Sequence, residues 1–199
     1  MSGGISGIFL ARRGIASGGI SEDFVAGHFH LVMGVAATFA ILAAIFFWFP
    51  KLFGRRLNES LGKTHFWLTF AGVYCVFMPM HWLGLISQSA RKSGGDLASV
   101  AELLGPARSF VTAGILITVF AQGIFLFNFL WSLLHGERIK ESNPWRSTTL
   151  EWSVASASMD DVGDGKPAVF RGAYEFDVPG VAEDFIPQHV APDRVAKAN

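Results

Sequence analysis

Two histidines separated by one residue, His28 and His30, are the side chains of this sequence best suited to chemistry. They begin an apolar run, residues 24–49, that contains no Asp, Glu, Lys or Arg. A helix turns by about 100° per residue, so positions two apart point to roughly opposite sides, and the two rings cannot share one metal ion. An imidazole inside a membrane is costly and usually functional, and it is a common axial ligand of haem iron. The spacing therefore predicts two haems, one on each flank of a membrane helix.

Three segments have the composition of membrane spans. Hydrophobic residues make up 51% of the 199-residue chain, charged residues make up 16%, and the mean hydropathy is +0.38. Residues 24–49, 66–86 and 110–134 lack acidic and basic side chains, and each reaches the roughly 20 residues needed to cross the hydrocarbon core. We therefore predict an all-α membrane protein whose three transmembrane helices lie in residues 23–135.

The last third of the chain has a different composition. Residues 136–199 hold eleven acidic and seven basic residues, a formal charge of −4, and five of the eight prolines. Such a segment is typical of an irregular, extramembrane tail. Residues 168–170 and 174–178 predict short strands at most.

Basic residues are slightly more numerous on the side of the membrane that carries the tail. Seven lie in the first loop and after the third span, against five on the other side. The positive-inside rule then favours a cytoplasmic tail and places His28 and His30 near the outer surface. Membrane lipid is an expected partner, and nucleic acid is not.

Polar side chains within the spans are expected mainly to join helices. They are Thr69, Thr112, Thr118, Gln122, Asn128 and Ser132. His81, which follows Pro79 near the outer end of the second span, has two interpretations: a hydrogen-bonding role beside a cofactor, or a satisfied structural histidine.

Several motifs resemble subunit I of the haem–copper oxidases. Residues 23–50, DFVAGHFHLVMGVAATFAILAAIFFWFP, resemble the tenth helix of that subunit, where an A-H-F-H segment supplies two haem ligands. The runs NESLGK and FMPMHWLG resemble the following loop and the eleventh helix. NPWRSTTLEW, PAVFRGAYEF and EDFIPQ are similar to the tail of A-type bacterial cytochrome c oxidases. Residues 1–22, which include GGISGIFLA, form a divergent segment that resembles the end of the ninth helix.

The resemblance implies haem ligands in this chain. His28 matches the proximal ligand of the high-spin, oxygen-reducing haem, and His30 matches one axial ligand of the low-spin haem, both of the a type. Phe29 would fill the gap between the two macrocycles. Arg91 matches one of two arginines that bind haem propionates, while Ala90 stands at the position of the other and Lys92 is a candidate replacement.

The sequence departs from the family at a magnesium site. Ile20 and Ser21 occupy the positions of a histidine and an aspartate that serve this site in the family. Neither side chain suits Mg²⁺ as those do, so we expect the site to be lost unless Glu22 or Asp23 replaces them.

The resemblance implies a role in a respiratory cytochrome c oxidase of a bacterial inner membrane. Electrons would come from cytochrome c through the copper-bearing subunit II, and oxygen would be reduced to water with proton translocation. The expected partners are the N-terminal portion of subunit I and subunits II and III. The copper ligands of the family lie in that N-terminal portion, so the chain alone should be inactive. Two alternatives remain: a degenerate or truncated paralogue with a structural or assembly role and no haem, and a separate haem protein that shuttles electrons.

Overall fold

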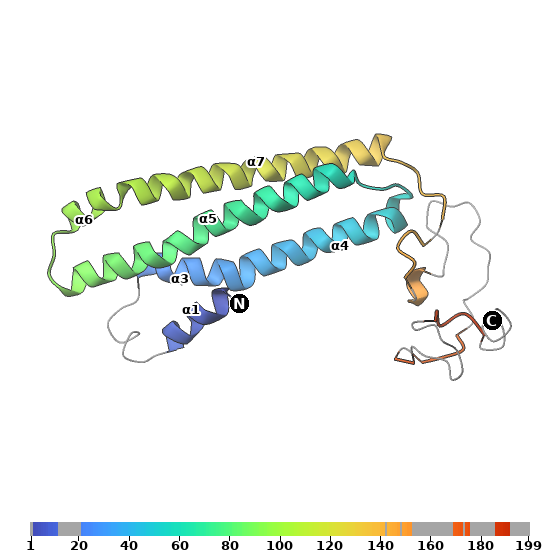
Figure 1. Cartoon of the computed structure of the whole chain (residues 1–199), viewed down its shortest axis with the longest axis horizontal. Helices are drawn as coiled ribbons and strands as arrows, with labels where there is room; N and C mark the ends of the chain where they lie inside the picture. The colour runs from blue at the N-terminus through green and yellow to red at the C-terminus, as the bar shows by residue number, and fades with distance from the viewer. Residues whose placement is uncertain are drawn as a thin grey trace. The chain divides into compact units, whose positions relative to one another are not determined.

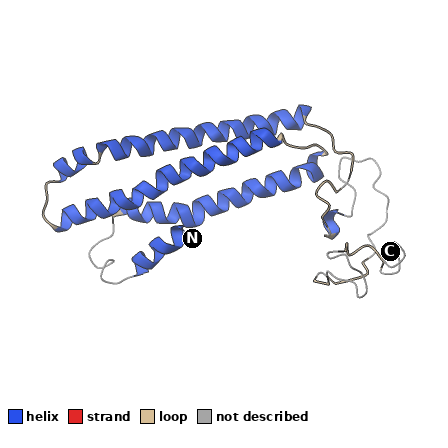
Figure 2. Ribbon diagram, in the orientation of Figure 1, coloured by secondary structure: helices blue, strands red, loops and turns tan. Residues whose placement is uncertain are grey.

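The computed structural model describes residues 2–11, 21–141, 143–147, 149–152, 169–172, 174–175 and 186–191. These residues form helices, turns and loops (Figure 2), and within them no strand occurs beyond one isolated antiparallel bridge between Arg55 and Arg138. They divide into two compact units, Met1–Ala44 with Asn58–Leu130, and Ile45–Leu57 with Trp131–Asn199. Each unit is described separately below.

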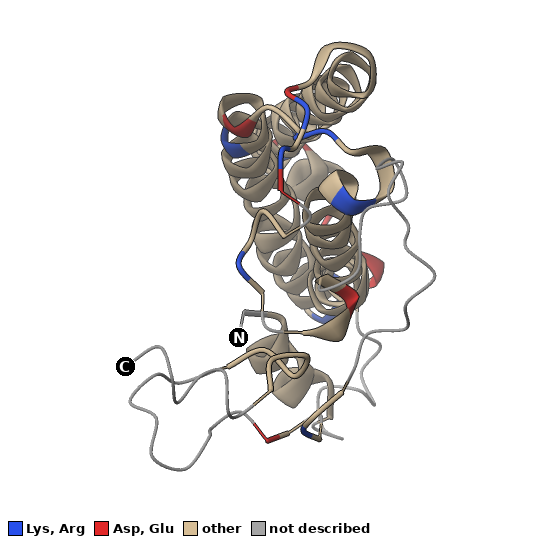
Figure 3. Ribbon diagram, turned by 90° about the vertical axis from the view of Figure 1, so that its right-hand side faces the viewer, with Lys and Arg blue, Asp and Glu red and all other residues tan. Residues whose placement is uncertain are grey.

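Three continuous helices are long and apolar enough to cross a membrane, which confirms the predicted all-α membrane fold. The first runs from Glu22 to Phe53 and consists of α3 (Glu22–Phe29), a π-helical turn η1 (His30–Gly34) and α4 (Val35–Phe53). The others are α5 (Glu59–Lys92) and α7 (Gly105–His135), and all three are labelled in Figure 1. Lys, Arg, Asp and Glu lie mainly at the helix ends and in the connections, while the helix bodies carry other residues (Figure 3).

Each long helix extends beyond the apolar segment predicted for it, because polar residues at its ends also support helical backbone. At the start of α5, the Asn58 side chain caps the helix by accepting a hydrogen bond from the Leu61 N–H at 3.0 Å. Glu59 and Lys63 form an i,i+4 ion pair at 2.7 Å, an arrangement that favours an exposed helical turn. The helical bounds are therefore set by caps and charges as well as by hydrophobicity.

Two shorter helices accompany the long ones. The first, α1 (Ser2–Ala11), lies in the segment that resembles the end of a helix. The second, α6 (Leu97–Leu103), was not predicted. It follows Asp96, whose carboxylate accepts hydrogen bonds from the N–H groups of Ala98 at 3.0 Å and Ser99 at 3.2 Å. An aspartate in this position is a typical N-cap.

Small and polar residues join α5 to α7. A Cβ added at Gly72 of α5 would meet Thr118 and the carbonyl of Gly114 on α7, so the absence of side chains lets the two backbones approach. Gln122 Nε2 donates to Thr69 Oγ1 at 3.0 Å across the same interface. The expectation that polar residues in the spans join helices is confirmed for this pair.

Asn128 connects α7 to the start of α5. Its Nδ2 donates to the Asn58 carbonyl at 2.9 Å, and the Asn58 N–H donates back to Asn128 Oδ1 at 3.0 Å, so α7 is bonded to the residue that caps α5.

Two threonines in the third span do not bridge helices. The hydroxyls of Thr112 and Thr118 instead donate to carbonyls of their own helix, those of Arg108 and Gly114, at 3.0 Å and 2.9 Å. A threonine hydroxyl can make its hydrogen bond to a carbonyl of its own helix, so the expectation that these two hydroxyls join helices is wrong.

Within the second unit, aromatic residues of the tail pack on the end of α4. Trp145 Nε1 donates to the Phe47 carbonyl at 3.0 Å. Trp152, in the 3₁₀ turn η2 (Leu150–Trp152), is fully buried and stacks on Trp48 with ring centroids 5.7 Å apart. Of the expected strand positions, residues 169–170 and 174–175 are not strand, and residues 168 and 176–178 lie outside the described residues.

Candidate functional site

The imidazole of His28 is held by α1. Its Nδ1 lies 2.9 Å from Ser6 Oγ and 3.0 Å from the carbonyl oxygen of Gly3. The absence of a side chain at Gly7 leaves room beside the ring, because a Cβ there would lie 3.2 Å from His28 Cε1. A carbonyl oxygen only accepts hydrogen bonds, so Nδ1 carries the proton and the lone pair of the neutral ring is on Nε2.

The imidazole of His30 is held by its own helix and by α5. Its Nδ1 lies 2.7 Å from the Ala26 carbonyl oxygen, which again assigns the proton to Nδ1 and the lone pair to Nε2. The ring stacks on Phe77 of α5, with centroids 4.8 Å apart. Among the described residues, none hydrogen-bonds to Nε2 of either His28 or His30.

The two rings therefore contact different helices, as a separation of two residues on one helix predicts. Phe29, between them, is 54% exposed and forms a T-shaped contact with the His28 ring at a centroid distance of 5.9 Å. Its expected place between two macrocycles stays a prediction.

The imidazoles of His28 and His30 fit two separate haem irons. Each ring uses Nδ1 to bond to protein, which is the usual way in which a ligating histidine is oriented while Nε2 faces the metal. No group of three or more His, Cys, Asp or Glu side chains suited to a metal ion occurs within the described part of the chain. The geometry thus suits single imidazole ligands to separate irons.

Close contacts of glycines bring α3 against α5 and so position the histidines. A Cβ added at Gly84 of α5 would lie 2.6 Å from the backbone nitrogen of Phe24 and 2.7 Å from its Cβ. On α3, a Cβ added at Gly27 would lie 2.9 Å from His81 Nδ1 and 3.0 Å from the Phe77 carbonyl oxygen. Neither glycine can be enlarged without moving backbone or a buried ring.

The two ring nitrogens of His81 differ in their surroundings. Its Nδ1 bonds to the Phe77 carbonyl at 2.7 Å, and its ring forms a T-shaped contact with Phe24 at a centroid distance of 5.0 Å. Its Nε2 is buried and has no hydrogen-bond partner among the described residues. One nitrogen is thus satisfied as in a structural histidine, and the other is not.

The remaining predicted site residues lie near the ends of α3 and α5. Arg91 is exposed in the last turn of α5, next to Lys92, and neither forms an ion pair with a described residue. Ser21 is buried and precedes α3, where its carbonyl accepts the Phe24 N–H at 3.1 Å. Ile20 lies outside the described residues. Propionate binding and the loss of the magnesium site therefore stay predictions.

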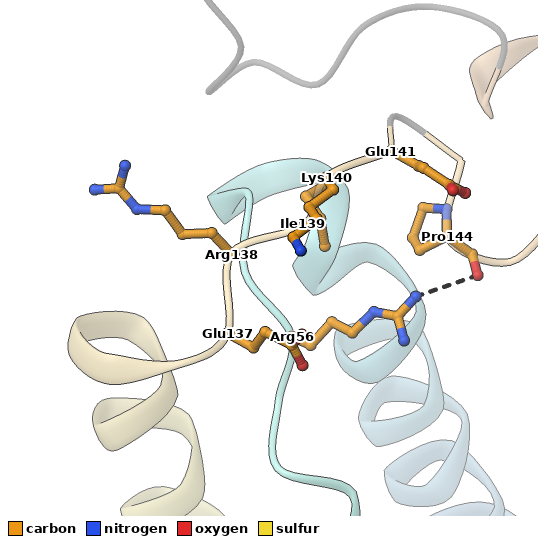
Figure 4. Close-up of a pocket in the computed structure, with 7 residues that line it drawn as sticks. All are labelled: Arg56, Glu137, Arg138, Ile139, Lys140, Glu141 and Pro144. Carbon is orange, nitrogen blue, oxygen red and sulfur yellow. Dashed lines mark hydrogen bonds between the residues drawn. The ribbon is translucent and has the colours of Figure 1, made fainter.

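Sequence reasoning did not find a pocket in the second unit (Figure 4). Its volume is about 220 Å³, and it is lined by Arg56, Glu137, Arg138, Ile139, Lys140, Glu141 and Pro144. Arg56 Nη2 donates to the Pro144 carbonyl at 3.4 Å, and its guanidinium lies over the ring of Trp145 at 5.8 Å. Arg138 points away from the other side chains in Figure 4. Three basic and two acidic side chains give the pocket no preference for one sign of charge.

Comparison with known proteins gives a consistent result. The family model described as Cytochrome C and Quinol oxidase polypeptide I matches residues 1–103. The chain is similar to the alternative cytochrome c oxidase subunit 1 of Bradyrhizobium diazoefficiens, with 45% identity over 195 residues. This alignment covers 96% of the chain and 33% of the relative. The chain is 36% and 34% identical to the cytochrome c oxidase subunit 1 proteins of Synechocystis and Thermostichus vulcanus, and it covers 31% of each. The chain thus spans about a third of the length of these relatives.

Proposed function

This chain belongs to the family of cytochrome c and quinol oxidase polypeptide I, and from that premise we propose that it is part of subunit I of a respiratory cytochrome c oxidase. Its three helices would lie in a bacterial inner membrane, with the tail on the cytoplasmic side. Cytochrome c would supply electrons through subunit II. The N-terminal portion of subunit I, which holds the copper ligands in the family, would complete the site with subunits II and III beside it.

Within this complex, we propose that His28 and His30 each hold one haem iron through Nε2. The observation that carries the proposal is that each Nδ1 is bonded to a backbone carbonyl, at 3.0 Å and 2.7 Å, while the two rings contact different helices. Two haems, when bound, supply electron transfer and oxygen reduction. The chain orients the imidazoles: α1 fixes His28, and Phe77 of α5 fixes His30. Coupling to proton translocation is part of the same proposal.

One observation favours the alternative of a structural or assembly role without haem. Ser21 and Ala90 stand where the family has ligands for magnesium and for a haem propionate. A chain that no longer held cofactors would have no need of either group. This alternative predicts that the chain assembles into an oxidase complex without contributing haem ligands.

Absorbance spectra separate the two functions. The chain is to be purified together with its membrane partners, and haem content is to be measured per copy of the chain. We expect one low-spin and one high-spin haem in the assembled complex, and little haem on the isolated chain, since each iron would lack its other protein contacts. A stable complex that holds this chain and yet has no haem would support the assembly role.

A further inference from the structure

The hydroxyl of Ser6 lies at the centre of the contact between α1 and His28. Ser6 is 6% exposed. Its Oγ is 2.9 Å from the Gly3 carbonyl oxygen, one turn earlier in α1, and 2.9 Å from His28 Nδ1. The third side of this triangle, from Gly3 O to His28 Nδ1, is 3.0 Å.

The proton count of the triangle fixes the direction of each hydrogen bond. Gly3 O can only accept, and the hydroxyl and the ring supply one proton each. If the hydroxyl donated to Nδ1, two lone pairs would face each other between Nδ1 and Gly3 O. The hydroxyl therefore donates to Gly3 O, and the Nδ1–H is shared between Gly3 O and Ser6 Oγ. Ser6 is an acceptor toward the imidazole.

We propose that Ser6 is a positioning residue for the iron ligand His28, which rests on the function proposed above. By accepting from Nδ1–H, the hydroxyl fixes the tautomer and the orientation of the ring and raises electron density on Nε2. A ligating histidine is tuned by the partner of its second nitrogen in this way. Among the residues that the structure describes, no side chain bonds to Nδ1 of His30, which bonds to the Ala26 carbonyl instead. The two ligands thus differ in how they can be tuned.

The test replaces Ser6 in the assembled oxidase that contains this chain. Ser6→Ala removes the acceptor, Ser6→Cys keeps a side chain of similar size but with a weaker acceptor, and Ser6→Thr keeps the hydroxyl. The readout is the iron–histidine stretching band of the ferrous high-spin haem in resonance Raman spectra. We expect a downshift in Ser6→Ala, a smaller downshift in Ser6→Cys and the native frequency in Ser6→Thr. The absorbance of the low-spin haem should not change in any of the three variants.

Ser109→Ala is the matched control. Its hydroxyl donates to the Gly105 carbonyl at 3.2 Å within α7, so removing it deletes a hydroxyl of the same kind away from any histidine. The iron–histidine band should be native in this variant.

The outcomes separate the inference from the proposed function. A native band in Ser6→Ala, with full haem content, overturns the role of Ser6 and leaves the proposed function intact. Absence of high-spin haem from the unaltered complex overturns the proposed function itself. If Ser6→Ala fails to assemble, the comparison of Ser6→Cys with Ser6→Thr decides, because equal bands in these two variants also overturn the inference.

Discussion

The ring of His30 lies nearly parallel to the ring of Phe77, with 4.8 Å between their centroids and 14° between their planes. Phe77 belongs to α5, so the orientation of His30 depends on the packing of α3 and η1 against that helix. Two fixed contacts, this stack and the 2.7 Å bond to Ala26, leave the ring little freedom about its side-chain torsions.

Replacing His30 should remove the low-spin haem alone. The His30→Ala change leaves the Ser6 and Gly3 contacts of His28 in place, because those contacts lie on α1. We expect the assembled complex to lose the low-spin haem absorbance and to retain at least part of its carbon monoxide binding at the high-spin haem. An unchanged low-spin spectrum in an assembled variant would contradict the assignment of His30.

Replacing His28 should do the reverse. The His28→Ala change leaves the stack of His30 on Phe77 in place. We expect loss of carbon monoxide and cyanide binding and of oxygen turnover, while the low-spin absorbance is retained. The two histidine variants serve as controls for each other. If both assemble with native spectra and turnover, the role without haem is the better interpretation.

Enlarging Gly84 should separate α3 from α5. An alanine Cβ would lie 2.6 Å from the Phe24 backbone nitrogen, and overpacking of this kind costs about 1–3 kcal/mol. We expect Gly84→Ala to lower the midpoint of thermal unfolding in detergent and to reduce haem content. Gly123→Ala is the control, because a Cβ added there would meet no described atom within 4 Å apart from its chain neighbours and the backbone of its own helix. Equal unfolding midpoints for the two variants would show that the close contact between Gly84 and Phe24 does not limit stability.

Removing the amide of Asn128 should destabilise the contact between α7 and the start of α5. Asn128 is 1% exposed, and its side chain pairs with both backbone groups of Asn58. Asn128→Leu leaves those two groups without this partner, at a cost of about 2 kcal/mol. Phe127→Leu, at a neighbouring position that is 55% exposed, should cost much less. Denaturant titration of helicity would measure the difference, and similar titration curves would refute the prediction.

The three spans could be predicted because uncharged apolar runs of this length are uncommon outside membranes. Their ends could not, because Asn58, Glu59 and Lys63 continue α5 with a cap and an ion pair that a hydropathy pattern does not register. The helix α6 does have a readable signal in the capping residue Asp96, but it lies outside the long apolar runs that mark the spans.

For the candidate site, the sequence predicts that His28 and His30 face different neighbours but not which neighbours they face. Ser6 and Gly3 are separated from His28 by 22 and 25 residues, and residues 12–20 between them lie outside the described part of the chain. A helical period says nothing about contacts across such a distance. The stack of His30 on Phe77 depends in the same way on how two helices pack.

The π turn sets the rotational phase of the histidines relative to the rest of their helix. The Val35 N–H donates to the His30 carbonyl, five residues back, which accommodates one residue more than a regular α-helical turn. A regular α-helix with the same number of residues would place everything before the turn about 100° away from its present azimuth relative to α4. Deleting one residue between His30 and Val35 should therefore restore a regular α-helical turn and keep both imidazoles on the faces they now occupy, whereas straightening the turn without a deletion would rotate them by about 100°. The faces on which His28 and His30 lie thus depend on this turn as well as on their positions in the sequence.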